Sequence, residues 1–410
     1  MSFQFFEIPR EKEVMALFVA INTQGHKCSL LDDGPSLMDL KARRSKEKFY
    51  CEMCGGEVVL KLGTQVAWHF AHKQAADCPL NHEPESIHHQ LGKMQLYYWL
   101  KDNQTIVHCE HYISKIQQRA DLFLQLKDAP LAIEYQCSTI PIELLASRTR
   151  GYQSLNIDVI WLLGGERLKA AEKNVYKLST MDAMVCRYDQ QLPTLLYYNT
   201  RTDCFVFLYP LATLTTSRIL GVTKTLPRNL VSPQLFSYKP KVSMALKDWI
   251  QPWLKQKERW RTKPLAIFTH EERYLYTMCR HKRKLFSCFP AFVGIPMMAS
   301  FILSTPTYVW QMWLVLTFID RPSGTILHLK TITQAFSKMI QKSIFHLRPS
   351  LYTKPSIKHV VTGYFNFLIR ANILAPLAEN KYQVIQPMEW KNEDLDTLLK
   401  WDNDVLRKYY

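Results

Sequence analysis

Residues 119–138 read RADLFLQLKDAPLAIEYQCS, and this stretch decides the fold. Two runs rich in apolar residues, 119–126 and 130–138, flank a short polar turn, which is the pattern of two neighbouring β-strands. Asp121 lies near the start of the first run, and Glu134 lies inside the second, where burying a carboxylate is costly without a partner. The stretch therefore predicts two paired strands that bring two acidic side chains together.

The segments on either side of this pair complete an α/β domain. The expected order is helix, strand, strand, strand, helix, strand, which places helices over a mixed sheet. Pro84 suits the first turn of the first helix, because its fixed φ matches helical backbone. The expected elements are a helix from Pro84 to about Lys101, a strand over 105–113, the two strands above joined by a turn at Lys127 and Asp128, a helix from Pro141 to before Gly151, and a strand over 158–163.

The polar residues of this domain suit metal-dependent hydrolysis of a phosphodiester, which needs oxygen ligands from two or three carboxylates on rigid elements. Glu134 and Gln136 are two apart in a strand and so share a face that Asp121 can approach from the neighbouring strand. Each residue alone also fits an ordinary ion pair or a buried histidine, so the hypothesis rests on the set. A polar stripe with a spacing of four residues runs along the first helix and consists of Glu85, His89 and Lys93.

A second cluster of potential ligands precedes this domain. Cys51 and Cys54 have the two-residue spacing that lets both thiolates reach one ion, and two glycines follow them directly. Five soft or borderline ligands lie within 28 residues, whereas a structural zinc ion takes four. The alternative is a hairpin with incidental Cys and His. The preferred zinc ligands are Cys51, Cys54, His72 and Cys78. His69 is the alternative fourth ligand, or a residue that hydrogen-bonds to one of the ligands.

The overall composition favours a polyanionic partner. The 410 residues carry 52 Lys and Arg against 36 Asp and Glu, a net charge of +16. Such a surplus attracts nucleic acid first and anionic lipid second, although a merely basic soluble protein is the plain alternative. Charged residues interrupt the N-terminal segment, which argues against a secretory signal, and the ten cysteines lack the density of a disulfide scaffold. A cytoplasmic protein is expected.

Beyond residue 240 the pattern is mostly helical and basic. Residues 285–319 carry no Lys, Arg, Asp or Glu, but repeated prolines favour buried helices over a membrane span. A helix over 357–371, followed by two short apolar runs, is compatible with a winged-helix-like module. Two basic stretches with aromatic neighbours are candidates for single-stranded DNA contacts; a solvated surface and peripheral membrane contact are the alternatives. The candidate DNA-binding residues are Arg259, Trp260, Arg261, Lys282, Arg283 and Lys284.

These motifs together resemble the competence protein CoiA family of bacteria that take up DNA. The match is strong over roughly 15–165 and less specific in the C-terminal half. The motifs that carry it are Cys51-x-x-Cys54 with His69-Phe-Ala-His72, Glu85-Ser-x-x-His89-x-x-x-Lys93, Arg119-Ala-Asp121, Glu134-x-Gln136-x-Ser138, Arg148-x-x-x-Tyr152, Val159-Ile-Trp161-Leu-Leu-Gly164 and Trp310-Gln311.

The resemblance implies a restriction-endonuclease-like core of the PD-(D/E)XK type, in which Glu85, Asp121 and Glu134 bind Mg²⁺ or Mn²⁺. The usual lysine two residues after the last acid is Gln136 here, and Lys93 is a candidate for the missing cation. The implied role is processing or recombination of incoming single-stranded DNA during natural transformation. The alternative is a non-catalytic DNA-binding factor that assists a recombinase.

Three domains are therefore expected. Residues 1–82 form an N-terminal hairpin with a zinc-binding segment, residues 83–165 form the nuclease core, and residues 166–410 form a mixed and then mainly helical basic domain. The expected partners are DNA and recombination proteins.

Overall fold

The computed structural model describes residues 17–32, 36–64, 67–73, 78, 86–103, 105–126, 129–189, 192–233 and 245–410. Glu85 and the turn expected at Lys127 and Asp128 lie outside the described residues. Contacts within the chain divide it into two units. The first comprises Met1–Arg167, Leu196–Val206 and Thr225–Pro240, and the second comprises Leu168–Leu195, Phe207–Lys224 and Lys241–Tyr410.

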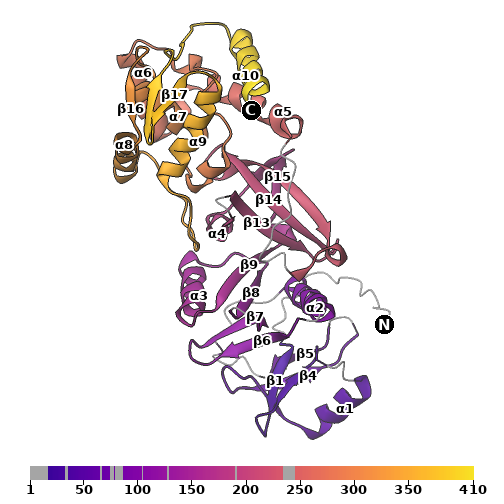
Figure 1. Cartoon of the computed structure of the whole chain (residues 1–410). Helices are drawn as coiled ribbons and strands as arrows, with labels where there is room; N and C mark the ends of the chain where they lie inside the picture. The colour runs from indigo at the N-terminus through magenta and orange to yellow at the C-terminus, as the bar shows by residue number, and fades with distance from the viewer. Residues whose placement is uncertain are drawn as a thin grey trace. The chain divides into compact units, whose positions relative to one another are not determined.

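The first unit begins with an antiparallel sheet in the order β2-β1-β3-β4-β5 (Figure 1). β1 and β2 form a hairpin, and the Asn22 side-chain oxygen accepts the backbone N–H groups of Gln24 and His26 in its turn. The buried side chains of this sheet form a small core of their own that includes Cys51 and Cys78. The elements are β1 Val19–Asn22, β2 Lys27–Ser29, α1 Leu37–Lys46, β3 Phe49–Tyr50, β4 Glu57–Lys61 and β5 His69–His72.

A mixed sheet with two helices follows in the first unit. β6 pairs with β7 and β7 with β8 in antiparallel fashion, whereas β8 and β9 are parallel. A parallel pair needs a crossover, which α3 provides between β8 and β9. The elements are α2 Ile87–Asp102, β6 Val107–Ile113, β7 Gln118–Leu124, β8 Leu131–Gln136, α3 Ile142–Ser154 and β9 Asp158–Gly164.

The two helices cover opposite faces of strand β8. Glu134 accepts hydrogen bonds from side chains of α3, whereas the Tyr135 ring lies against α2. Successive residues of a strand point to opposite faces, so these contacts place α2 and α3 on different sides. A Cβ at Gly92 would lie 2.0 Å from the Tyr135 ring, so glycine is what lets α2 approach the sheet this closely.

Helix α3 is longer than the sequence suggested. It was expected to end before Gly151, but it continues to Ser154. A Cβ at Gly151 would lie 2.4 Å from the side-chain nitrogen of Gln118. This glycine therefore marks a close approach of the helix to β7 and does not end the helix.

Residues 168–227 contribute strands in the order β10-β11-β15-β14-β13, and β12 pairs with β13. Within the first unit, Tyr197 of β13 pairs with Leu163 of β9 in parallel orientation. The elements are β10 Lys169–Glu172, β11 Val175–Lys177, α4 Thr180–Met184, β12 Arg187–Asp189, β13 Leu192–Asn199, β14 Cys204–Thr213 and β15 Arg218–Pro227.

The C-terminal part of the second unit combines helices with a three-stranded sheet. The stretch without charged residues contributes the wholly buried helix α7, in which Gln311 exchanges two hydrogen bonds with the Ile295 backbone. No helix among the described residues combines the length and apolarity that a membrane crossing requires. The elements are α5 Leu246–Arg261, α6 His270–His281, α7 Thr307–Leu314, β16 Ile326–His328, α8 Leu329–Gln341, α9 Ile357–Arg370, β17 Leu374–Ala378, β18 Lys381–Val384 and α10 Leu395–Tyr409.

Candidate functional site

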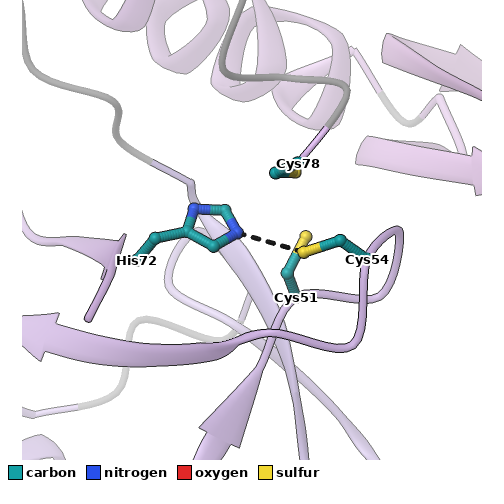
Figure 2. A group of neighbouring side chains, drawn as sticks. All are labelled: Cys51, Cys54, His72 and Cys78. Atoms are coloured by element: carbon teal, nitrogen blue, oxygen red, sulfur yellow. Dashed lines mark hydrogen bonds between the residues drawn. The ribbon is translucent and has the colours of Figure 1, made fainter. Parts of the chain in front are cut away.

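Four side chains beside the N-terminal sheet converge on one point: Cys51, Cys54, His72 and Cys78 (Figure 2). One ligand atom from each lies within 4.8 Å of the others, and the Cys54 Sγ is 3.3 Å from the His72 Nε2. Gly55, with φ of +69°, makes the tight turn that follows the two thiols. Three thiols and one imidazole at this spacing fit a tetrahedral zinc ion and leave no position for a reactive water.

His69, the alternative fourth ligand, lies outside this cluster. Its ring Nδ1 is 2.8 Å from the Ala67 carbonyl oxygen, and the side chain is buried. His69 and His72 are both in β5 and are three residues apart, so their side chains leave opposite faces of the strand. This parity was available in the sequence once the segment was assigned to a strand.

The two acidic residues predicted to act together lie where β7 and β8 stop pairing. The paired section runs from Leu124 with Leu131 to Leu122 with Ile133. Asp121 comes directly before Leu122 in β7. Its carboxylate accepts the backbone N–H of Tyr135 at 2.9 Å, in place of the backbone carbonyl that would accept it if the two strands went on pairing.

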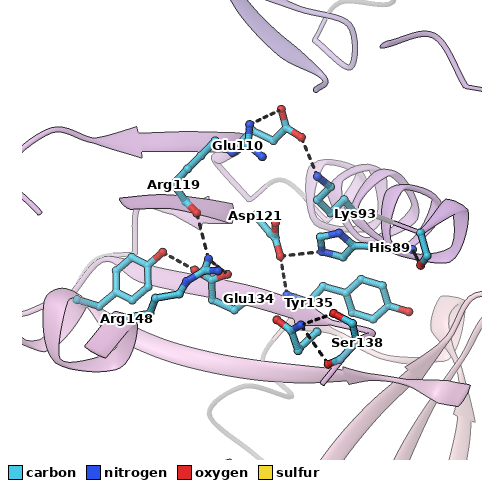
Figure 3. Close-up of polar contacts among 12 residues, drawn as sticks. His89, Lys93, Glu110, Arg119, Asp121, Glu134, Tyr135, Ser138 and Arg148 are labelled. Carbon is cyan, nitrogen blue, oxygen red and sulfur yellow. Dashed lines mark hydrogen bonds and ion pairs between the residues drawn. The ribbon is translucent and has the colours of Figure 1, made fainter. Parts of the chain in front are cut away.

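The Asp121 carboxylate also approaches helix α2. Its Oδ2 lies 3.1 Å from the Nε2 of His89 (Figure 3). His89 in turn stacks on the Tyr135 ring, with the ring centroids 5.8 Å apart. The first half of α2 therefore contributes a polar side chain to the same place as β7, as the stripe on that helix had suggested.

Glu134 is buried on β8 and held from α3. The Arg148 guanidinium donates to one carboxylate oxygen at 2.6 Å, and the Tyr152 hydroxyl donates to the other. Burial raises the pKa of Glu134 to about 7, and the charge of Asp121 adds to this rise, while Arg148 and Tyr152 oppose it. The carboxylate thus lies in a place where an additional cation would be favoured.

Arg148 and Tyr152 had no assigned role in the sequence reasoning. Their spacing of four residues on a helix puts both side chains on one face, and that face meets Glu134. The spacing was visible in the sequence, but their common partner lies on the preceding strand, 14 and 18 residues earlier, and the sequence does not show which face of that strand the helix covers. Arg148 also lies over the Trp161 ring, 5.5 Å from its centroid, which fixes the guanidinium from the other side.

Lys93, the candidate for the missing cation, is fully buried and donates to Glu110 at 2.7 Å. Glu110 was missed by the sequence reasoning. Its second oxygen accepts the backbone N–H groups of Phe18 and Val19, so this carboxylate joins helix α2 to the N-terminal hairpin. Glu110 has φ of +49°, a conformation that costs free energy for a residue with a side chain and that the surrounding contacts must hold.

Gln136 occupies the position where a lysine was expected from the resemblance. Its amide nitrogen donates to the carbonyl and to the hydroxyl oxygen of Ser138, at 3.1 and 3.0 Å. The side chain is 8% exposed. A neutral amide held in this way orients the end of β8 but brings no positive charge to the acidic pair.

Two of the proposed DNA-binding residues are buried, and these predictions were wrong. Trp260 is 3% exposed and packs between Trp253 and Tyr308. Arg261 is 4% exposed and forms an ion pair with Asp402. Both lie on the inner side of α5, so neither is available to phosphates or bases.

The remaining basic candidates differ in their surroundings. Arg259 forms an ion pair with Glu172 at 2.8 Å, and Lys284 forms one with Asp320 at 2.9 Å. Lys282 and Arg283 are exposed at the C-terminal end of α6. Among the described residues, the basic patch predicted from sequence is therefore reduced to two exposed side chains without an ion pair, Lys282 and Arg283.

Comparisons with known proteins agree with the motifs. Family models of competence protein CoiA match in three parts: the N-terminal domain over residues 35–81, the nuclease-like domain over 85–240 and the C-terminal domain over 250–398. The chain is 31% identical to "Competence protein CoiA" of Bacillus subtilis (strain 168) over 350 residues, which cover 83% of this chain and 91% of that protein. No solved structure was found to match. The chain therefore belongs to the competence protein CoiA family and carries its nuclease-like domain.

Proposed function

We propose that this protein is a metal-dependent nuclease that processes DNA, single-stranded DNA above all, during natural transformation and recombination. The observation that carries the proposal is the pair of buried carboxylates, Asp121 and Glu134, at the point where β7 and β8 separate. The nuclease-like domain and the printed name of the relative support the setting in competence. Cytoplasmic action with recombination proteins as partners is part of the proposal.

The proposed core is restriction-endonuclease-like, with Asp121, Glu134 and Glu85 as ligands of Mg²⁺ or Mn²⁺. Two carboxylates with a histidine beside them fit a hard cation that prefers oxygen ligands. When bound, such an ion stabilises negative charge that develops on the phosphate. Glu134 accepts from Arg148 and Tyr152, and Arg148 is proposed to release its oxygen when a cation binds, because the two positive charges repel.

The released guanidinium is well placed to hold the DNA. A guanidinium binds phosphate through two parallel hydrogen bonds, and Arg148 is anchored over Trp161 near the acidic pair. His89 orients the Asp121 carboxylate, whereas the charge of Lys93 on the same helix is taken up by the buried Glu110. Arg148 and His89 are thus proposed to position the substrate and the acids.

The second candidate function is non-catalytic DNA binding in support of a recombinase. Two observations favour it: Gln136 supplies no charge, and Glu134 is already satisfied by two donors. A protein of this kind keeps the nuclease fold and uses it to hold DNA.

One assay separates the two functions. The purified full-length chain, prepared without chelators, is incubated with labelled single-stranded, double-stranded and gapped DNA in the presence of Mg²⁺, Mn²⁺ or no added divalent ion. Cleavage that needs the added ion, and that is lost in Glu134→Gln, is the expected result. Binding without cleavage of any of these substrates would establish the second candidate.

We further propose that Cys51, Cys54, His72 and Cys78 hold a structural zinc ion, supported by their mutual distances. Elemental analysis is expected to give about one zinc per chain. Cys51→Ser is expected to lose the ion and to destabilise the N-terminal sheet, whereas Cys204→Ser, a change of a cysteine outside the cluster, keeps both. A zinc content well below one in the unchanged protein would contradict the proposal.

A further inference from the structure

Residues 307–384 form a module whose topology differs from the rest of the chain. The element order is α7, β16, α8, α9, β17, β18, and the three strands form an antiparallel sheet in the order β16-β18-β17 (Figure 1). A helix, a strand, two helices and a hairpin connected in this way form a winged helix. In that arrangement α9 corresponds to the recognition helix and the turn between β17 and β18 to the wing.

The module has its own aromatic core. Trp310 of α7 packs against Phe336 of α8 and Tyr364 of α9, with ring centroids 6.2 and 5.7 Å apart. Phe365 of α9 packs against Tyr382 of β18 at 4.9 Å. These contacts fix α9 between the other two helices and the sheet, so that a rigid element presents its outer face.

The outer face of α9 is polar and open. The buried residues of this helix occupy one side, and three exposed polar residues recur on the other. Lys358, Asn366 and Arg370 are exposed, and Thr362 is half-buried, and these four are spaced by four residues along one stripe. The stripe combines cations with side chains that both donate and accept hydrogen bonds.

The module is strongly basic. Residues 307–384 contain nine Lys and Arg residues and two acidic residues, Asp320 and Glu379. Among the described residues, six exposed cations on or directly after α8, on α9 and at the start of β18 make no ion pair with a carboxylate, in contrast to Arg259 and Lys284. These six are Lys330, Lys338, Lys342, Lys358, Arg370 and Lys381.

We propose that this module is a binding site for double-stranded DNA, with α9 in the major groove and the β17–β18 turn beside the phosphate backbone. Unpaired cations suit phosphates, and an amide such as that of Asn366 can read an adenine edge in the groove. The B-form major groove admits an α-helix, whereas that of double-stranded RNA is too narrow. This function is independent of the acidic pair and of cleavage, and it adds a duplex contact to a protein proposed to process single strands.

The test is fluorescence anisotropy with the full-length protein and no added divalent ion, so that cleavage does not enter the measurement. The probes are a 20-base-pair DNA duplex, one of its single strands and an RNA duplex of the same sequence. The double variant Lys358→Glu/Asn366→Ala is expected to raise the Kd for the DNA duplex at least about tenfold and to flatten its salt dependence.

Lys247→Glu is the matched control. Lys247 and Lys358 are both exposed and are each the second residue of a helix in the same unit, so the two reversals change charge and helix ends alike. The control is expected to change the Kd by less than about threefold, the effect of net charge alone. Measuring without a divalent ion separates this proposal from the nuclease, because the proposed cleavage needs one.

Three results would overturn the proposal: equal losses in the double variant and the control, RNA duplex binding as tight as DNA duplex binding, or no duplex binding by the unchanged protein. A parallel titration with vesicles of anionic phospholipid covers the remaining alternative. Vesicle binding that depends on Lys358, together with weak duplex binding, would assign this face to a membrane surface.

Discussion

Two clusters of buried charged residues in this protein both combine acids with cations, but the balance of charge differs between them. In the second unit, Asp402 of α10 accepts hydrogen bonds from Lys257 and Arg261 of α5. The remaining donors of these cations end on backbone carbonyls, among them those of Ala291 and Phe289. The acid is outnumbered, every charge has partners, and the cluster joins two helices.

In the nuclease-like domain two acids lie close together where strands separate. Burial and the charge of Asp121 both raise the pKa of Glu134. Asp121 has a histidine ring and a backbone N–H as partners, and Glu134 shares its oxygens between Arg148 and Tyr152. Burial of charge alone therefore does not mark a functional site. A surplus of acids, held by groups that can exchange partners, does mark one.

The largest expected effect tests this contrast with one substitution made in each cluster. Asp121→Asn keeps the acceptor for Tyr135 but removes the charge. Metal-dependent cleavage is expected to fall by about 10⁴-fold, which is about 5.5 kcal/mol of activation free energy. Single-turnover assays measure the rate, and thermal unfolding is expected to show a fold as stable as that of the unchanged protein. A strongly destabilised variant would place Asp121 among the structural charges.

Asp402→Asn is the same chemical change in the other cluster. It leaves two buried cations without their counter-ion, so the unfolding free energy is expected to fall by about 3–5 kcal/mol. Denaturant unfolding measures it. Asp404→Asn is the control, since Asp404 is exposed on the same helix. Equal unfolding free energies of Asp402→Asn and Asp404→Asn would show that the Asp402 cluster is not the structural cluster that the comparison assumes.

A substitution of Lys93 tests whether its ion pair with Glu110 stabilises the fold or takes part in cleavage. Lys93→Met removes the nearer of the two cations beside the buried Glu110 and leaves Arg119 at 3.7 Å, and a loss of about 3 kcal/mol of unfolding free energy is expected. Glu110→Gln added to this variant is expected to restore part of that loss, because the poorly compensated charge disappears. A hundredfold fall in cleavage at unchanged stability would instead assign Lys93 to the nuclease group.

The smallest effect is expected at Gln136. Gln136→Ala removes the hydrogen bonds to Ser138 but no charge, so cleavage is expected to fall less than about tenfold. Gln136→Lys places a cation near the acidic pair and is expected to raise the rate. If Gln136→Ala matched Asp121→Asn in its loss, the amide itself would be required for the chemistry.

Short sequence patterns were enough to predict the central strands and the cluster of metal-ligand side chains. Two apolar runs on either side of a polar turn located β7 and β8, and the two-residue spacing of Cys51 and Cys54 located a cluster of potential ligands that the structure contains. Membership of the CoiA family is confirmed. Zinc, the divalent ion and the DNA substrate stay predictions.

Contacts between residues that are far apart in the chain could not be predicted from short sequence patterns. Lys257 and Asp402 are 145 residues apart, and nothing near α5 shows which of its cations turn inward. A basic stretch with tryptophans therefore looked like a DNA-binding surface, although Trp260 and Arg261 belong to the core. Glu110 was missed for the same reason, because its backbone partners at Phe18 and Val19 precede it by more than 90 residues.

The contact between Glu110 and the hairpin has a consequence for the order of folding during synthesis. All four cysteine and histidine ligands leave the ribosome before residue 110, so the ligand cluster can assemble while the start of β1 still lacks its acceptor. The N–H groups of Phe18 and Val19 are satisfied only when β6 emerges. Strand β1 is therefore completed later than the ligand cluster beside it, and until then these two N–H groups are open to acceptors of other chains.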